Sequence, residues 1–304
     1  MLNNIKTMHE LNLDKINKVF PNEIKSWTYH NDGFDSYVYS INDEWIFKIP
    51  KRDEVWESLK REKDFLDYFF EISPSNVPNF EFFGERIVGY KKISGKKLAN
   101  EFFESLDEVE QNLIVNQFGI FLKTLHSSRC QKQTPSEYRN FFNKEGFISL
   151  ATKIQKIIIP KVSKNIQNNI NDFLQKFQKN ERNFQNQQGS VHADLYANNV
   201  LWDTNKKKLG VIDFGDVAKS AVVKDFTLLL ADYCNSENDL LLKNLLKVYS
   251  SQDHDLFRKV KEFSKLEKLY WPVEDIEDSL IDPSKENDFE RNLAKVIEVF
   301  KNKE

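Results

Sequence analysis

The chain has 304 residues, and its content of 40% hydrophobic and 30% charged side chains is typical of a globular protein rather than a disordered one. Its formal net charge of -3 argues against a general nucleic-acid binder, which would normally carry a basic surplus. Two cysteines, Cys130 and Cys234, are too few for a disulfide framework and suit a reducing compartment.

The N-terminal segment mixes Asn, Lys, Glu and Asp with single apolar residues, so residues 1–21 hold no apolar stretch of the kind found in secretory signals. No run in the sequence approaches the roughly 18 apolar residues that a membrane span needs. We therefore expect a cytoplasmic protein that works as a monomer without a membrane or a nucleic acid.

The first third of the chain predicts a small β-rich unit. A short amphipathic helix over residues 10–20 ends at Pro21, and residues 53–71 have the apolar spacing of a second helix. Runs rich in aromatic and β-branched residues predict five strands. These strands are expected at 27–30, 37–41, 45–49, 80–83 and 87–93. The unit ends near Ile93, and the dipeptide Ser94-Gly95 is typical of a hinge.

The remainder of the chain is predicted to be mostly helical. Residues 107–127 and 165–179 favour helices, 190–217 favour strands and loops, and helices follow from Val222. The pattern of residues 131–165 leaves their structure open. We therefore expect an α+β fold with an N-terminal domain over 1–93 and a larger, mainly helical domain over 94–304.

Two motifs in the second domain carry acidic residues at the ends of apolar runs. The first is V-H-A-D-L-Y-A-N-N-V-L at 191–201, and the second is G-V-I-D-F-G-D at 210–216. Phosphoryl transfer needs one carboxylate to orient an attacking hydroxyl, a second to hold Mg²⁺, and an amide oxygen to complete the metal shell. Asp194, Asp213 and Asn199 match these three roles in that order.

Together these motifs resemble the catalytic and metal-binding loops of eukaryotic-like kinases. Ala193, after His192, and Asp216, after the glycine, make them more similar to the aminoglycoside and related antibiotic phosphotransferases. Ala193 stands where protein kinases carry an arginine, and no A-P-E-like segment follows Asp213. The resemblance implies a bilobal protein-kinase-like fold, and these two departures from protein kinases put activation-loop control and a protein substrate in doubt. His192 is expected to brace the loop backbone, and His126 to cap or pack a helix end.

Lys48 lies in the predicted strand W-I-F-K-I-P, between apolar neighbours. A lysine buried there is costly unless its ammonium group is paired. In a kinase the α- and β-phosphates and a helix carboxylate would supply the pairs, and Glu62 is the first choice, with Glu57 as the second. The alternative is a lysine on an edge strand that points to water.

Two further segments are candidates for nucleotide contacts. In the loop at 31–36, Gly33 would let backbone amides approach phosphate and Ser36 would add a hydroxyl, although a plain hairpin turn is the alternative. The segment 89–95 resembles the strand and hinge that receive a purine. This resemblance implies Tyr90 as gatekeeper, and backbone groups from Lys91 to Ile93 at the edge of the base. The donor can be ATP or GTP.

The C-terminal segment supplies the candidate contacts to the acceptor. Residues 274–290 carry eight acidic side chains and one lysine, which would attract a cationic acceptor, although a solvated helix face is the alternative. Residues 263–276 resemble the C-terminal segment of aminoglycoside 2''-phosphotransferases. The resemblance implies acceptor contacts from Glu267 and Trp271, with Asp232 and Glu237 nearby.

The resemblance as a whole implies a Mg²⁺-dependent kinase that moves the γ-phosphate of ATP or GTP to a hydroxyl of a cationic aminoglycoside. One alternative is a metabolic kinase of the same fold that acts on choline, a sugar amine or another small alcohol. A second alternative is a catalytically silent nucleotide-binding protein, and the complete set of Asp194, Asn199 and Asp213 argues against it.

Overall fold

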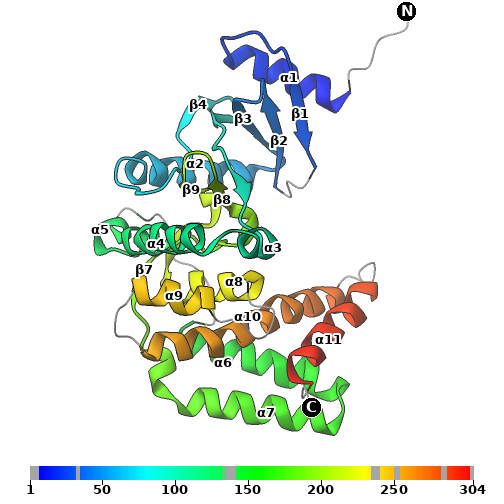
Figure 1. The fold of residues 1–304 in the computed structure, drawn as a ribbon. Coiled ribbons are helices and arrows are strands. Elements are labelled where there is room, and N and C mark those ends of the chain that lie inside the picture. The colour runs from blue at the N-terminus through cyan, green and yellow to red at the C-terminus, as the bar shows by residue number, and fades with distance from the viewer. Residues whose placement is uncertain are drawn as a thin grey trace, which may run out of the picture.

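The computed structural model places a β-rich lobe above a larger helical lobe (Figure 1). The residues that the structure describes are 7–31, 35–132, 134, 142–233, 240–249, 254–281 and 286–301. The predicted α+β, two-lobed architecture is confirmed. Among the helices in these ranges, none combines the length and the apolar character that crossing a membrane requires.

The N-terminal lobe is built on an antiparallel sheet in the order β1-β2-β3-β5-β4. Its strands are β1 (Trp27–His30), β2 (Ser36–Ile41), β3 (Trp45–Pro50), β4 (Phe80–Gly84) and β5 (Ile87–Lys91). Each predicted strand is present, with ends that shift by at most two residues. β3 therefore lies in the centre of the sheet and not at an edge, so Lys48 is paired on both sides, with Val38 of β2 and Val88 of β5.

Two helices flank this sheet. α1 (Met8–Val19) starts at a capping box in which Thr7 and Glu10 bond each other's backbone, and it buries Ile16 against the sheet. α2 (Asp53–Phe69) turns a stripe of apolar residues inward, and its buried face also carries Glu62. Because α2 lies between the sheet and the lower lobe, a charge on this face is held near the boundary between the lobes (Figure 1).

The C-terminal lobe is a packed set of helices. They are α3 (Asn100–Glu104), α4 (Glu108–Leu125), α5 (Ser128–Gln131), α6 (Lys144–Lys153), α7 (Lys164–Lys179), α8 (Val223–Tyr233), α9 (Leu240–Tyr249), α10 (His254–Ile281) and α11 (Glu286–Phe300). The predicted helices over 107–127 and 165–179 correspond to α4 and α7. The part of the chain left open, 131–165, contains α6, which continues into a π-helical turn at Ile154–Ile158.

Short strands between α7 and α8 position the two motifs. β7 (Gln188–Val191) pairs with β10 (Ala218–Ala221), while β8 (Val200–Asp203) lies between β6 (Lys96–Lys97) and β9 (Lys208–Val211). The first motif begins at the end of β7 and the second at the end of β9. Since both strands are buried, the polar residues that follow them emerge together at the base of the upper lobe.

Hydrogen bonds at the hinge and after α2 connect the two lobes. At the predicted hinge, the hydroxyl of Ser94 donates a hydrogen bond to Asp203 in β8. Away from the hinge, Asn76 pairs with β9: its N–H donates to the carbonyl of Leu209 at 2.9 Å, and its carbonyl accepts from the N–H of Val211 at 2.9 Å. The second connection fixes the loop after α2 to the strand that leads to Asp213.

We expect Gly95→Ala to destabilise the protein by about 2–4 kcal/mol. Gly95 has a φ of +136°, and an added Cβ would lie 2.8 Å from the carbonyl carbon of Trp202, which is backbone and cannot rotate away. Gly84→Ala is the matched control, because Gly84 has a φ of +153° but open space around it. Chemical denaturation should show a clearly larger loss for Gly95→Ala than for the control, and equal losses would contradict this account of the hinge.

Candidate active site

A cavity of about 810 Å³ lies between the two lobes and takes its lining from both. It brings together most of the residues that the sequence singles out for catalysis, metal binding and donor binding. These are Ser36, Lys48, Glu62, Tyr90, Ile93, Asp194, Asn199 and Asp213. Residues far apart in the chain therefore share one cavity, such as Lys48 and Asp213, which are 165 positions apart.

The loop that carries Asp194 is held from below by Asp225 in α8. The Asp225 carboxylate accepts hydrogen bonds from the backbone N–H groups of His192 at 2.9 Å and Ala193 at 3.0 Å. Ala193 has a φ of +66°, a left-handed conformation that the two bonds help to stabilise. Burial by itself would raise the pKa of Asp225. Hydrogen bonds and charge interactions with His126 and His192 outweigh burial, so the pKa lies below its usual value.

Asp225 is a residue that sequence reasoning did not select. Its signal was present, because an acidic residue inside the apolar run V-V-K-D-F-T-L-L-L needs partners when the helix is buried. The structure gives it a third bond, 3.0 Å between Oδ2 and His126 Nε2. His126 was expected to cap or pack a helix end. It does pack against Tyr249, and it also forms part of this buried network.

His192 braces the loop through both ring nitrogens. Its Nδ1 accepts a bond from the N–H of Asp194 at 3.3 Å, so Nε2 is the protonated nitrogen and donates to the carbonyl of Ile212 at 3.0 Å. The ring also packs on Phe214, with centroids 4.7 Å apart. These contacts connect the first motif to the second and agree with a bracing role.

Asp194 and Asn199 are in direct contact. The Asn199 amide nitrogen donates to both the carbonyl and the Oδ2 of Asp194, each at 2.8 Å. Burial, with smaller contributions from the charges of Asp213 and Asp216, raises the pKa of Asp194 to about 6. A carboxyl whose pKa lies closer to neutrality is a better proton acceptor than an ordinary aspartate.

Lys48 lies between two carboxylates. Its Nζ is 3.0 Å from Asp213 Oδ1 and 4.0 Å from Glu62 Oε1. Burial alone would lower the pKa of Lys48, but these charges outweigh it and the pKa lies well above its usual value. The Lys48 charge in turn holds the pKa of Asp213 below its ordinary value. The ammonium group is therefore charged and fixed at the base of the cavity.

Glu62, rather than Glu57, is the helix carboxylate that faces Lys48. Its Oε1 also accepts from the N–H of Phe214 at 3.0 Å, so it links α2 to the second motif, and burial raises its pKa to about 7. Glu57 is exposed and pairs with Lys60 one turn along the same helix. The second choice for the Lys48 partner is thus turned away from the cavity.

The donor atoms around Asp213 suit a hard cation such as Mg²⁺. Asp213 is in the left-handed region with a φ of +68°, and only its Oδ1 bonds Lys48. Asn199 uses its amide nitrogen for Asp194, which leaves the amide oxygen. A carboxylate oxygen and an amide oxygen are ligands that Mg²⁺ accepts. Among the described residues, no group of three or more His, Cys, Asp or Glu side chains is arranged to hold a metal ion. Phosphate and water oxygens are further ligands that Mg²⁺ accepts.

The hinge end of the cavity has an aromatic wall. Tyr90 is buried, and burial raises its pKa to about 12, so the hydroxyl stays protonated. Ile93 lines the cavity, whereas the side chain of Lys91 is exposed and its ammonium lies over Trp45. Lys91 can therefore contribute only backbone groups here, as the sequence predicts. Gly33 lies outside the residues that the structure describes.

Two of the predicted acceptor residues, Glu267 and Trp271, lie apart from this cavity. Glu267 is buried and its Oε1 is 2.7 Å from Lys224, while Trp271 is half exposed on α10. Neither lines the 810 Å³ cavity. Asp232 lies in α8, but its side chain is not described, and Glu237 is outside the described residues. In the acidic segment, Glu274 and Glu277 both pair with Lys153 of α6.

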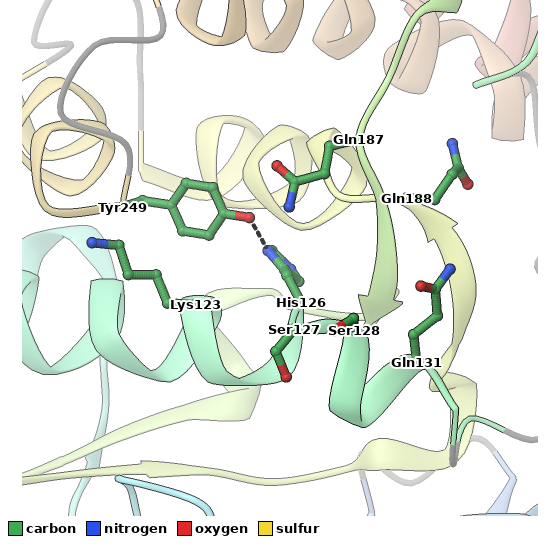
Figure 2. A pocket seen from close by; sticks show the side chains of 8 residues that line it. All are labelled: Lys123, His126, Ser127, Ser128, Gln131, Gln187, Gln188 and Tyr249. Atoms are coloured by element: carbon green, nitrogen blue, oxygen red, sulfur yellow. Dashed lines mark hydrogen bonds between the residues drawn. The ribbon is translucent and has the colours of Figure 1, made fainter.

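A smaller hollow of about 320 Å³ lies beside the His126 network, and Figure 2 shows its polar lining. There the hydroxyl of Tyr249 is 2.8 Å from His126 Nδ1, so a line of hydrogen bonds runs from Tyr249 through His126 to Asp225. This hollow contains neither motif. Its relevance to the site is that Tyr249 and His126 fix the Asp225 carboxylate, which holds the loop that carries Asp194.

Known proteins share both the sequence pattern and the fold. A family model described as "Phosphotransferase enzyme family" matches residues 26–263, which is more than half of the chain. The GDP and kanamycin complex of APH(2")-IIia superposes with a TM-score of 0.79 at 22% identity, covering 95% of this chain and 97% of that one. The gentamicin complex of APH(2")-IIa gives 0.70 at 22% identity, covering 97% and 99%. The macrolide 2'-phosphotransferase MphH from Brachybacterium faecium gives 0.72 at 14% identity, covering 94% and 97%.

Proposed function

Because the chain belongs to the phosphotransferase enzyme family, we propose that it moves the γ-phosphate of a nucleoside triphosphate to a hydroxyl of a cationic aminoglycoside. The observation that carries this proposal is the meeting of Asp194, Asn199 and Asp213 with Lys48 in one cavity between the lobes. The same arrangement argues against a silent nucleotide-binding protein, since all the groups that the chemistry needs are present.

Each residue has a role that its surroundings support. Asp194 orients the acceptor hydroxyl and takes its proton, which a pKa of about 6 favours. Lys48, charged and held by two carboxylates, binds the α- and β-phosphates. Asn199 and Asp213 would hold Mg²⁺, which when bound neutralises charge on the β- and γ-phosphates. The base would lie against Tyr90 and Ile93, and Ser36 would bond a phosphate.

Two observations support a cationic sugar as the acceptor. The segment 274–290 is strongly acidic, and two of the structures that share this fold are complexes with kanamycin and with gentamicin. We propose Glu267 and Trp271 as acceptor contacts, with Asp232 and Glu237 nearby. Glu267 would first have to move, because its carboxylate is buried against Lys224. We place the activity in the cytoplasm, where triphosphates are supplied, and expect a monomer to suffice because every catalytic group belongs to one chain.

An acceptor screen tests this function. The purified protein is incubated with Mg²⁺ and either ATP or GTP, and phosphate transfer to kanamycin, gentamicin, a macrolide and choline is measured. We expect transfer to at least one aminoglycoside, with a ratio of kcat to KM well above that for choline or the macrolide. Turnover of choline or a macrolide without any aminoglycoside turnover would reject the proposed acceptor, and failure with every acceptor in both nucleotides would reject the kinase.

A further inference from the structure

Lys48 is not the only cation that lines the donor cavity, because Arg52 lies there too and has had no role so far. Arg52 follows β3 and precedes α2, and its guanidinium pairs with the carboxylate of Asp35 on the loop before β2. Both side chains line the cavity, with 51% and 57% of their surface exposed. Arg52 is also the N-cap residue of α2. Its charge therefore lies at the wall of the cavity, beside the carboxylate of Asp35.

The direction of β3 places Arg52 at the phosphate end. Trp45, at the start of the strand, pairs with Lys91 beside the hinge, so β3 runs away from the hinge toward Lys48 and then Pro50. Arg52 comes four residues after Lys48, farther from the base site. A nucleotide whose base lies at the hinge and whose first phosphates reach Lys48 would therefore extend its terminal phosphate toward Arg52.

The charges of the cavity favour a cation besides Lys48 at the phosphate end. Six carboxylates and four Lys or Arg side chains line it. Lys48 is already matched by Asp213 and Glu62, and a triphosphate would add several negative charges to an acidic cavity. Phosphate offers a guanidinium the same two-oxygen geometry as a carboxylate, but with more charge.

We propose that Arg52 is a phosphate-binding residue that exchanges Asp35 for the terminal phosphates of the donor. Before the nucleotide enters, the Asp35 carboxylate takes the place of the terminal phosphate and holds the Arg52 guanidinium at the cavity wall. This proposal rests on the proposed function only in requiring that the cavity binds a nucleoside triphosphate. The alternative is that Arg52 merely braces the loop before β2 through its ion pair with Asp35.

Direct binding measurements separate these two roles without any acceptor. The affinities of the tri-, di- and monophosphates of adenosine and guanosine are measured by calorimetry in the presence of Mg²⁺. We expect Arg52→Gln to weaken triphosphate binding by roughly tenfold, diphosphate binding less, and monophosphate binding hardly at all. Asp35→Asn should act in the opposite direction and tighten triphosphate binding several-fold, because it removes a competing carboxylate. If Arg52 only braced the loop, both variants would break the same pair and weaken binding equally.

Arg86→Gln is the matched control. Arg86 forms a similar exposed ion pair with Asp53, the residue next to Arg52, but it does not line the cavity. Its substitution should leave all affinities unchanged. Equal effects of Arg52→Gln and Arg86→Gln, or weaker triphosphate binding in Asp35→Asn, would overturn the proposal. A wild-type protein that binds no triphosphate would overturn it together with the kinase. Absence of aminoglycoside turnover with normal nucleotide binding would overturn the proposed acceptor alone.

Discussion

Replacing Asp194 with alanine is expected to lower kcat by about 10²–10⁴-fold, the usual contribution of a positioned proton acceptor. The carboxylate is held by Asn199 at 2.8 Å, and burial together with two neighbouring acids raises its pKa to about 6. Alanine removes both the acceptor for the hydroxyl proton and the group that orients that hydroxyl. Steady-state kinetics with the best acceptor from the screen measures the loss.

Nucleotide binding should survive this substitution. Lys48, Asp213 and the hinge lie on the donor side of the cavity and keep their contacts with one another, so the affinity for the triphosphate should change by no more than a few-fold. The matched control is Asp172→Ala, which removes an exposed carboxylate from α7, outside the cavity and the acidic segment, and should leave kcat unchanged. Full turnover in Asp194→Ala would remove Asp194 from the chemical step. A parallel loss of nucleotide binding would show that it supports the cavity instead.

The donor side of the site could be predicted from the sequence because its residues follow a local rule. Asp194 and Asp213 each come directly after a buried strand, and Lys48 interrupts an apolar one. Buried polar groups need partners in the folded protein. The types and spacing of these three residues therefore predict that they pair with one another. The strand pattern of residues 27–91 follows from a similarly local signal, the clustering of aromatic and β-branched residues between turns.

The acceptor side could not be predicted in the same way. Glu267 was selected for its resemblance to a binding residue, yet its partner Lys224 lies on a different helix, 43 residues earlier. Which face of α10 meets α8 is decided by packing across the whole lobe, and no local pattern reports it. The same reason applies to Asp225. The sequence shows a buried acidic residue that needs partners, but those partners belong to a loop 33 residues away and to His126, 99 residues away at the end of α4.

Asp225→Ala is expected to destabilise the protein by about 3–5 kcal/mol, which is a large part of the stability of an ordinary domain. The substitution leaves the N–H groups of His192 and Ala193 buried without their acceptor, and it removes the partner of His126. A buried donor without a partner is costly, and here two of them belong to the loop that positions Asp194. Denaturant unfolding measures the loss of stability, and kcat of the folded fraction should also fall.

Two milder variants separate the roles of this network. Tyr249→Phe deletes only the hydroxyl at 2.8 Å from His126, so it should cost about 1 kcal/mol and leave kcat nearly unchanged. Asp225→Asn keeps the shape of the side chain, but its amide NH₂ group would face one of the three groups that donate to Asp225. Its loss of stability should therefore fall between those of Asp225→Ala and Tyr249→Phe. If Asp225→Ala unfolded at the same denaturant concentration as Tyr249→Phe, the carboxylate would not be what holds the loop. If stability fell but the folded fraction kept full kcat, the left-handed Ala193 and the position of Asp194 would have to be maintained by His192 and Asn199 instead.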